Sequence, residues 1–168
     1  DPNSPYRSWY DFDSKYKGGY RRWGGFETLP EVNEETPSYV EFITGEGGVI
    51  DTWLRRGAAG FRLDVADELP DEFIEKVRTA VKRVGPDKFL LGEVWEDATT
   101  KFGFDKRRTY LLGKGLDSVM NYPFKNAVLG FVCGRDAGQT MTDILSICEH
   151  YPAPALDTAL NFLSTHDT

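Results

Sequence analysis

Apolar residues along the chain fall into short runs rich in β-branched side chains, separated by longer amphipathic stretches. The runs predict four strands, at residues 60–65, 88–94, 116–121 and 159–164. The amphipathic stretches predict helices at 38–56, with an interruption at 45–48, and at about 97–112, 122–131 and 137–150. Strands that alternate with helices indicate right-handed βαβ units, and therefore a parallel sheet.

A further helix has clear start and stop signals. It is expected to begin after Pro70, because proline needs no donor at a helix start, and Asp71 and Glu72 then lie at the positive end of the helix dipole. Apolar residues follow at helical spacing, and Gly85 with Pro86 ends the pattern. The sequence thus places a helix between the first two strands.

The predicted strand ends recur at a regular interval. Asp64 and Glu93 are 29 positions apart, and Glu93 and Asn121 are 28 apart, which is the length of one βα unit. A closed (β/α)8 barrel takes about 250 residues, whereas only four strands are expected here. The sequence therefore predicts an α/β fold that covers about half of such a barrel.

Residues 1–38 are expected to form an irregular segment, because prolines and paired glycines interrupt every candidate helix within a few residues. The segment is nevertheless too rich in aromatic residues for a disordered tail. These are Tyr6, Trp9, Tyr10, Phe12, Tyr16, Tyr20, Trp23 and Phe26. We expect an ordered excursion that packs against another part of the protein.

Charge and composition exclude some partners. The chain has 20 basic and 27 acidic residues and a net charge of −7, which gives no electrostatic reason to expect nucleic acid or an anionic membrane. No stretch approaches the roughly 18 apolar residues of a membrane span. The opening residues resemble neither a signal nor a transit peptide. These features do not distinguish a cytoplasmic protein from a secreted one, and we expect a cytoplasmic location.

The two cysteines indicate no metal centre. Cys133 and Cys148 fit neither a metal-binding spacing nor a disulfide framework. We expect both to be buried thiols.

Three acidic residues stand at the ends of predicted strands: Asp64, Glu93 and Asp167. Active sites of (β/α)8 barrels lie at the carboxyl ends of the strands. A nucleophilic carboxylate and a proton-donating carboxyl group, with a third acid that steadies charge on the sugar ring, can break a glycosidic bond. A structural ion pair would explain Asp64 taken singly, and a turn or cap would explain Asp167, but three acids at successive strand ends favour an active site.

Neighbouring residues extend this candidate site. Side chains two apart on a strand share a face, so Arg62 is expected to point with Asp64 and to hold it ionised. Apolar residues around Glu93 are expected to raise its pKa, so that it can donate a proton. Trp95 is a candidate for stacking on a sugar face or, equally, for the core. His166 is a candidate for hydrogen bonding to a sugar hydroxyl.

The same positions match a known family. GFRLDVADELP, LLGEVWEDA and FLSTHDT resemble the second, third and fourth signature regions of the α-amylase family, glycoside hydrolase family 13, in the same order. LPEVN at 29–33 resembles a further signature in the long loop after the third barrel strand. LDSVMNYPF at 116–124 resembles the sixth-strand segment of the neopullulanase and cyclomaltodextrinase branch. The resemblance covers essentially the whole chain.

The resemblance implies how the chain is divided. Residues 1–38 would be the end of the excursion after strand 3, like the family's domain B, and residues 39–168 would be half of the catalytic barrel, about strands 4 to 7. The family's first signature would lie before Asp1 and the eighth strand after Thr168. The isolated chain is therefore expected to be inactive and to self-associate through its two open barrel edges.

The resemblance also implies residue roles. Asp64 would be the nucleophile, Glu93 the general acid/base and Asp167 the transition-state stabiliser, with Arg62 as partner of Asp64 and His166 as a sugar contact. Glu68, four residues after the nucleophile, is similar to the neopullulanase branch and favours short or cyclic maltodextrins over long starch. No cofactor is required, and this chain gives no support for a structural calcium ion in the longer protein.

The implied activity is that of a retaining glycoside hydrolase on α-1,4 glucosidic bonds, or α-1,6 bonds, of maltodextrins, cyclodextrins or starch. Two alternatives remain open. One is a non-catalytic amylase-like scaffold, although such relatives typically lose catalytic acids and this sequence retains three. The other is a transglycosylase or branching enzyme, which uses the same covalent intermediate and differs only in the acceptor.

Overall fold

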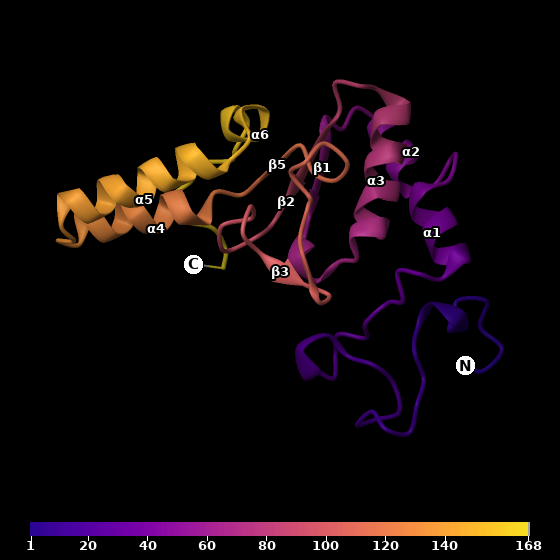
Figure 1. The fold of residues 1–168 in the computed structure, drawn as a ribbon. Helices are drawn as coiled ribbons and strands as arrows, with labels where there is room; N and C mark the ends of the chain where they lie inside the picture. The colour runs from indigo at the N-terminus through magenta and orange to yellow at the C-terminus, as the bar shows by residue number, and fades with distance from the viewer. Residues whose placement is uncertain (168) are drawn as a thin grey trace.

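The computed structural model describes residues 1–167 and has an α/β fold built on a parallel sheet (Figure 1). The sheet contains β1 (Gly60–Leu63), β2 (Phe89–Gly92) and β5 (Ser118–Val119) in the order β1-β2-β5. Both neighbouring pairs run parallel, as the alternation of strands and helices predicts. The fourth strand, expected at 159–164, is wrong in extent, since only Leu160 forms an isolated parallel bridge, to Met120.

Helices lie on two sides of this sheet in Figure 1. The crossover helix α3 (Asp71–Val84) joins β1 to β2 and packs with α1 (Pro37–Thr44) and α2 (Val49–Arg55). On the other side, α4 (Tyr122–Val132) and α5 (Ala137–His150) form a hairpin that extends away from the sheet, and α6 (Ala153–Asp157) follows. These positions confirm the helices expected at 38–56, 122–131 and 137–150, and the one after Pro70.

The helix expected at about 97–112 is wrong. That segment contains an antiparallel hairpin of β3 (Phe102–Gly103) and β4 (Lys106–Arg107). Between the strands, Phe104 and Asp105 have positive φ values of 53° and 59°, the conformation that a two-residue hairpin turn requires at both central positions. Two consecutive left-handed residues cannot continue a right-handed helix. A phenylalanine at such a position gives no sequence signal for the turn.

The N-terminal segment is an ordered excursion, as its aromatic content predicts. Its regular structure is limited to the short 3₁₀ turns η1 (Arg7–Trp9) and η2 (Trp23–Gly25) and two antiparallel bridges. The ring of Trp9 lies 5.2 Å from that of Tyr39 and 5.1 Å from that of Phe42, both on α1. These aromatic contacts attach the excursion to the helical layer.

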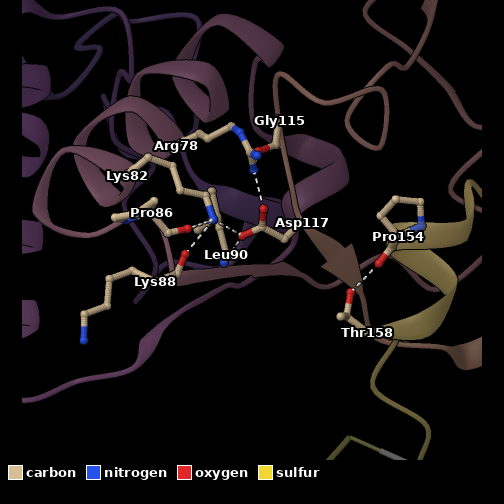
Figure 2. Close-up of polar contacts among 9 residues, drawn as sticks. All are labelled: Arg78, Lys82, Pro86, Lys88, Leu90, Gly115, Asp117, Pro154 and Thr158. Carbon is tan, nitrogen blue, oxygen red and sulfur yellow. Dashed lines mark hydrogen bonds and ion pairs between the residues drawn. The ribbon is translucent and has the colours of Figure 1, made fainter.

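Asp117 lies directly before β5, at the opposite end of the sheet from the candidate acids. Its carboxylate contacts residues of α3 and β2 (Figure 2). Arg78 and Lys82 of α3 donate to its two carboxylate oxygens at 2.7 and 2.8 Å. The N–H of Leu90 on β2 also donates to this carboxylate, at 2.8 Å. Burial acts to raise the pKa of Asp117, but these contacts outweigh it and lower the pKa overall.

Both cysteines are free and exposed, so the expectation of buried thiols is wrong. They lie at or on the α4–α5 hairpin, Cys133 directly after α4 and Cys148 within α5. This hairpin extends away from the sheet (Figure 1), and apolar side chains such as Val132 and Leu145 are exposed on it as well.

Candidate active site

Asp64 and Glu93 occupy equivalent places on neighbouring strands. Asp64 directly follows β1, and Glu93 directly follows β2. The parallel register pairs Leu63 with Gly92, so the two acids are the next residues along at the same edge of the sheet. This is the carboxyl edge, where barrel enzymes place their active sites.

One guanidinium group contacts both acids. Nη1 of Arg62 pairs with Oδ1 of Asp64, and Nη2 lies 3.0 Å from Oε1 of Glu93. The pairing of Arg62 with Asp64 is the contact that strand alternation predicts. The side chain of Asp64 is 73% exposed, so solvent and ligands can reach a carboxylate that an arginine holds in place.

Glu93 is buried, with 5% exposure, and its carboxylate is hydrogen-bonded on both oxygens. Oε1 accepts from the indole N–H of Trp95 at 3.0 Å, and Oε2 accepts from the backbone N–H of Val65 at 2.8 Å. Burial acts to raise the pKa of Glu93, but these hydrogen bonds and the charge of Arg62 outweigh it, and the pKa is lowered. The raised pKa expected from apolar neighbours is therefore wrong for the protein without substrate.

The backbone turn after Asp64 makes the contact with Glu93. Val65 has φ 45° and ψ 46°, in the left-handed region, which is unusual for a β-branched residue and marks a locally strained site. This conformation aims its N–H at the Glu93 carboxylate, and the N–H of Ala66 then donates to the Glu93 carbonyl at 3.0 Å. The sequence carried no signal for this turn.

A cavity of about 330 Å³ brings the three acids together. Its lining includes Asp64, Glu93 and Asp167, with Trp23, Val65, Asp67, Glu68, Trp95 and Glu96. A second cavity of about 370 Å³ shares Trp23, Asp64, Val65 and Glu68 with the first. Asp64 therefore lines both hollows.

Two tryptophans line this space. Trp95 is 48% exposed and stacks one face on Tyr122, with ring centroids 5.1 Å apart, which leaves its other face for a flat ligand. Trp23 comes from the N-terminal excursion and donates its indole N–H to Oε2 of Glu68 at 2.7 Å. Sequence reasoning missed Trp23, although its place among the aromatic residues before LPEVN was a usable signal.

His166 is the candidate residue that the structure does not bring to the cavity. It is exposed, its Nε2 lies 3.4 Å from Oδ1 of Asp167, and it lines neither of the two hollows beside Asp64. Within residues 1–167, His, Cys, Asp and Glu side chains form no group of three or more that could hold a metal ion. No helix in this part of the protein has the length and apolar character to cross a membrane.

The family model for the α-amylase catalytic domain matches residues 3–168. The chain belongs to the α-amylase family. An amylopullulanase from Thermoanaerobacter thermohydrosulfuricus is 33% identical over 98% of this chain and 12% of the relative. A cyclomaltodextrinase from a Bacillus species is 36% identical over 85% of this chain and 24% of the relative. The chain thus spans at most about a quarter of these two proteins.

Solved structures show the same relationship in the fold. The ligand-free cyclic α-maltosyl-(1→6)-maltose hydrolase from Arthrobacter globiformis superposes with a TM-score of 0.86 at 27% identity, over 100% of this chain and 37% of that one. A debranching enzyme from Nostoc punctiforme superposes with a TM-score of 0.84 at 28% identity, over 99% of this chain and 37% of that one. The sheet and helices described above are therefore part of an amylase-type (β/α)8 barrel.

Proposed function

We propose that the longer protein containing this chain is a retaining glycoside hydrolase that acts on α-glucosidic bonds of maltodextrins, cyclodextrins or starch. The observation that carries the proposal is the guanidinium of Arg62, which contacts Asp64 and Glu93 at once. Two carboxyl groups held by one guanidinium lie close together, as retaining enzymes require, whereas inverting enzymes need room for a water between them. Asp167 supports the proposal from the same cavity.

In the proposed mechanism, Asp64 attacks the anomeric carbon while Glu93 gives its proton to the departing glycosidic oxygen. The products of this step are a glycosyl ester on Asp64, a Glu93 carboxylate and the departing sugar, whose glycosidic oxygen is now a hydroxyl group. Glu93 then takes a proton from water, the resulting oxygen nucleophile attacks the anomeric carbon, and the bond from that carbon to Asp64 breaks to release Asp64 as a carboxylate. Asp167 stabilises positive charge on the ring during both steps.

Glu93 needs a proton for the first step, although its pKa is lowered in the protein without substrate. A sugar that fills the cavity removes water from Glu93, and loss of water raises the pKa of a carboxyl group. Substrate binding therefore supplies the condition under which Glu93 holds its proton. The left-handed turn at Val65 keeps the carboxyl group oriented meanwhile.

The family resemblance implies substrate contacts at Arg62, Glu68, Trp95 and His166, and two of these, Glu68 and Trp95, line the cavity with the acids. The open face of Trp95 suits a pyranose ring, and Glu68 favours short or cyclic maltodextrins. The relation to a cyclomaltodextrinase agrees with that preference, and the relation to an amylopullulanase keeps α-1,6 bonds among the candidates. Within this proposal, residues 1–38 end the excursion after barrel strand 3, and residues 39–168 form half of the barrel.

Product analysis of the full-length protein tests the proposal. Maltotriose, a cyclodextrin and pullulan are supplied separately, and the anomeric configuration of the first product is followed by proton NMR. Retained α-configuration is expected, because two successive displacements at the same carbon restore it. An inverted first product rules out Asp64 as nucleophile, and no hydrolysis of any of the three rules out the substrate class.

A further inference from the structure

Arg108 is a fully buried arginine that no proposed catalytic step uses. Its side chain is 0% exposed, and three of its nitrogen atoms each donate to a different acceptor. Nε donates to Oδ1 of Asp71 at 2.7 Å, Nη1 to the carbonyl of Asp67 at 2.5 Å and Nη2 to the carbonyl of Leu69 at 2.6 Å. The rings of Phe104 and Tyr110 lie 5.2 and 4.4 Å from its Cζ, so the guanidinium is also held in orientation.

Two of the acceptors belong to the connection between β1 and α3, and the third is on the first residue of α3. The 3₁₀ turn η3 (Ala66–Glu68) contributes the Asp67 carbonyl, Leu69 follows it, and Asp71 begins α3. Arg108 itself comes from the segment after β4, about 40 residues further along the chain. A planar guanidinium group with fixed donors to three acceptors restrains the path of the connection far more closely than a single charge would.

The same connection carries site residues. Val65 and Glu68 line the cavities beside Asp64, and the N–H of Val65 binds Glu93. The left-handed conformation of Val65 is one that persists only when its surroundings hold it. The Arg108 contacts begin two residues after Val65 and supply such a restraint.

We propose that Arg108 is a positioning residue for this site. By holding the carbonyls of Asp67 and Leu69, it keeps the connection in the form in which the Val65 N–H meets Glu93 and Glu68 faces the cavity. The proposal rests on the proposed function only for its effect on rate; its effect on the backbone is independent of any activity. A purely structural arginine would stabilise the start of α3 and leave the site geometry unchanged.

The test compares Arg108→Lys with Arg107→Lys in the full-length protein. Arg107 precedes Arg108 in the chain, is exposed, and donates from Nε and Nη2 to the carbonyl of Thr99 at 2.9 and 2.7 Å. Both changes keep the positive charge and remove the guanidinium group, but only Arg108→Lys alters contacts with the connection after Asp64.

Hydrogen exchange of the amides of residues 65–69 reads the backbone directly. Arg108→Lys is expected to speed exchange there while amides in the middle of α3 keep their rates, and Arg107→Lys is expected to change neither. Kinetics on maltotriose measure the effect of each change on kcat/KM. For Arg108→Lys, kcat/KM is expected to fall roughly 10- to 100-fold, as misplacement of site groups does; Arg107→Lys stays within about twofold of wild type.

The pH profile adds a readout that loss of stability does not move. The charged groups facing Glu93 are Arg62 and Asp64, with Asp67, Glu68, Glu96 and Asp167 around the same cavity; all of these remain in the variant. A weakened Val65 hydrogen bond is therefore expected to move the basic limb of kcat/KM to higher pH.

Gly103→Ala provides a gentler version, because a Cβ there would meet Nη1 of Arg108 at 3.3 Å. It is expected to shift the amide exchange of residues 65–69, kcat/KM and the basic limb of the pH profile in the same directions as Arg108→Lys, by smaller amounts. If Arg108→Lys does not fold, Gly103→Ala tests the role of Arg108. A folded Arg108→Lys with wild-type exchange at residues 65–69, or a folded Gly103→Ala with no change in exchange, overturns the proposal. If wild type cleaves no glucan, the proposed function fails, and hydrogen exchange alone decides the role of Arg108.

Discussion

The backbone N–H of Val65 donates to Oε2 of Glu93 at 2.8 Å. The turn after β1 is thus hydrogen-bonded to the acid after β2, and Arg62 links the same two strands through their acids. Acids that stand 29 positions apart in the sequence therefore share one network of contacts. A change in any member of this network is expected to alter the proton affinity of Glu93, its orientation, or both.

Trp95→Phe is the simplest test of what lowers the pKa of Glu93. The change removes the indole N–H that donates to Oε1 at 3.0 Å and keeps a ring to stack on Tyr122. Because that hydrogen bond lowers the pKa of Glu93, its loss raises the pKa. The proton donor then stays protonated to higher pH, and the basic limb of kcat/KM moves upward.

The matched control is Trp53→Phe, at an exposed tryptophan on α2 outside both cavities beside Asp64. Its pH profile should match that of wild type. A basic limb of Trp95→Phe that stays in place or moves to lower pH contradicts the assignment of Glu93 as the acid.

The free and substrate-bound forms should titrate differently. The basic limb of kcat/KM reports the acid in the free protein, and that of kcat reports it in the complex. Since a bound sugar excludes water from Glu93 and raises its pKa, the limb of kcat should lie at higher pH. Coincident limbs would mean that substrate binding leaves the environment of Glu93 unchanged.

Glu93→Gln should lower kcat/KM for maltotriose roughly 10²- to 10⁴-fold, the usual contribution of a general acid. Asp64→Asn should remove measurable turnover, since no glycosyl ester can form. Circular dichroism should show both variants folded. Glu149→Gln, at an exposed glutamate of α5, serves as the control and should keep wild-type rates; a comparable loss there would point to a non-specific effect of the substitution.

Asp117→Asn should destabilise the fold by about 1 to 3 kcal/mol at neutral pH, because it weakens hydrogen bonds from two cations and a backbone N–H. The pKa of Asp117 is lowered in the folded protein, so its stabilising effect is complete above the ordinary value near 3.9 and is lost as pH falls through the lower folded pKa. Denaturant midpoints should therefore converge between wild type and variant in acid. Asp157→Asn, at an exposed residue of α6, should change the midpoint at neither pH.

Leu90→Ala should lower the free energy of unfolding by about 2 to 5 kcal/mol, since Leu90 is 0% exposed. Leu112→Ala removes the same atoms from an exposed side chain and should cost less than about 0.5 kcal/mol. Denaturant titration of the full-length variants measures both. Equal losses would show that the sheet core is not where the structure places it.

The isolated 168-residue chain should hydrolyse no maltodextrin and should self-associate. In the described part of the chain, β1 pairs only with β2, so its other edge offers unpaired backbone groups to a second copy. Light scattering and an activity assay measure the two properties. A monodisperse monomer that cleaves maltodextrin would contradict both expectations.

The sequence predicted those parts of the molecule whose signals are local. The apolar runs located β1 and β2, Pro70 and Gly85 located α3, and alternation predicted the contact between Arg62 and Asp64. The β3–β4 hairpin was missed because its turn places Phe104 in a conformation that phenylalanine rarely adopts.

The environment of the acids could not be predicted, because it depends on contacts between distant segments. The pKa of Glu93 is lowered by hydrogen bonds from its near neighbour Trp95 and from Val65, 28 positions earlier, and by the charge of Arg62. Trp23 reaches Glu68 across 45 positions. The apolar neighbours alone suggested a raised pKa for Glu93. The hydrogen bonds that lower the pKa instead leave no periodic pattern in the sequence.

Covalent trapping tests the central claim, that Asp64 is the nucleophile of a retaining hydrolase. The full-length Glu93→Gln variant is incubated with α-maltosyl fluoride, whose fluoride departs without an acid while the missing base slows hydrolysis of the ester. Digestion and mass spectrometry are expected to find one maltosyl group on the peptide containing residues 60–68, attached to Asp64. A folded variant that consumes the fluoride and carries the maltosyl group on another residue, or on none while releasing inverted maltose, would contradict the account.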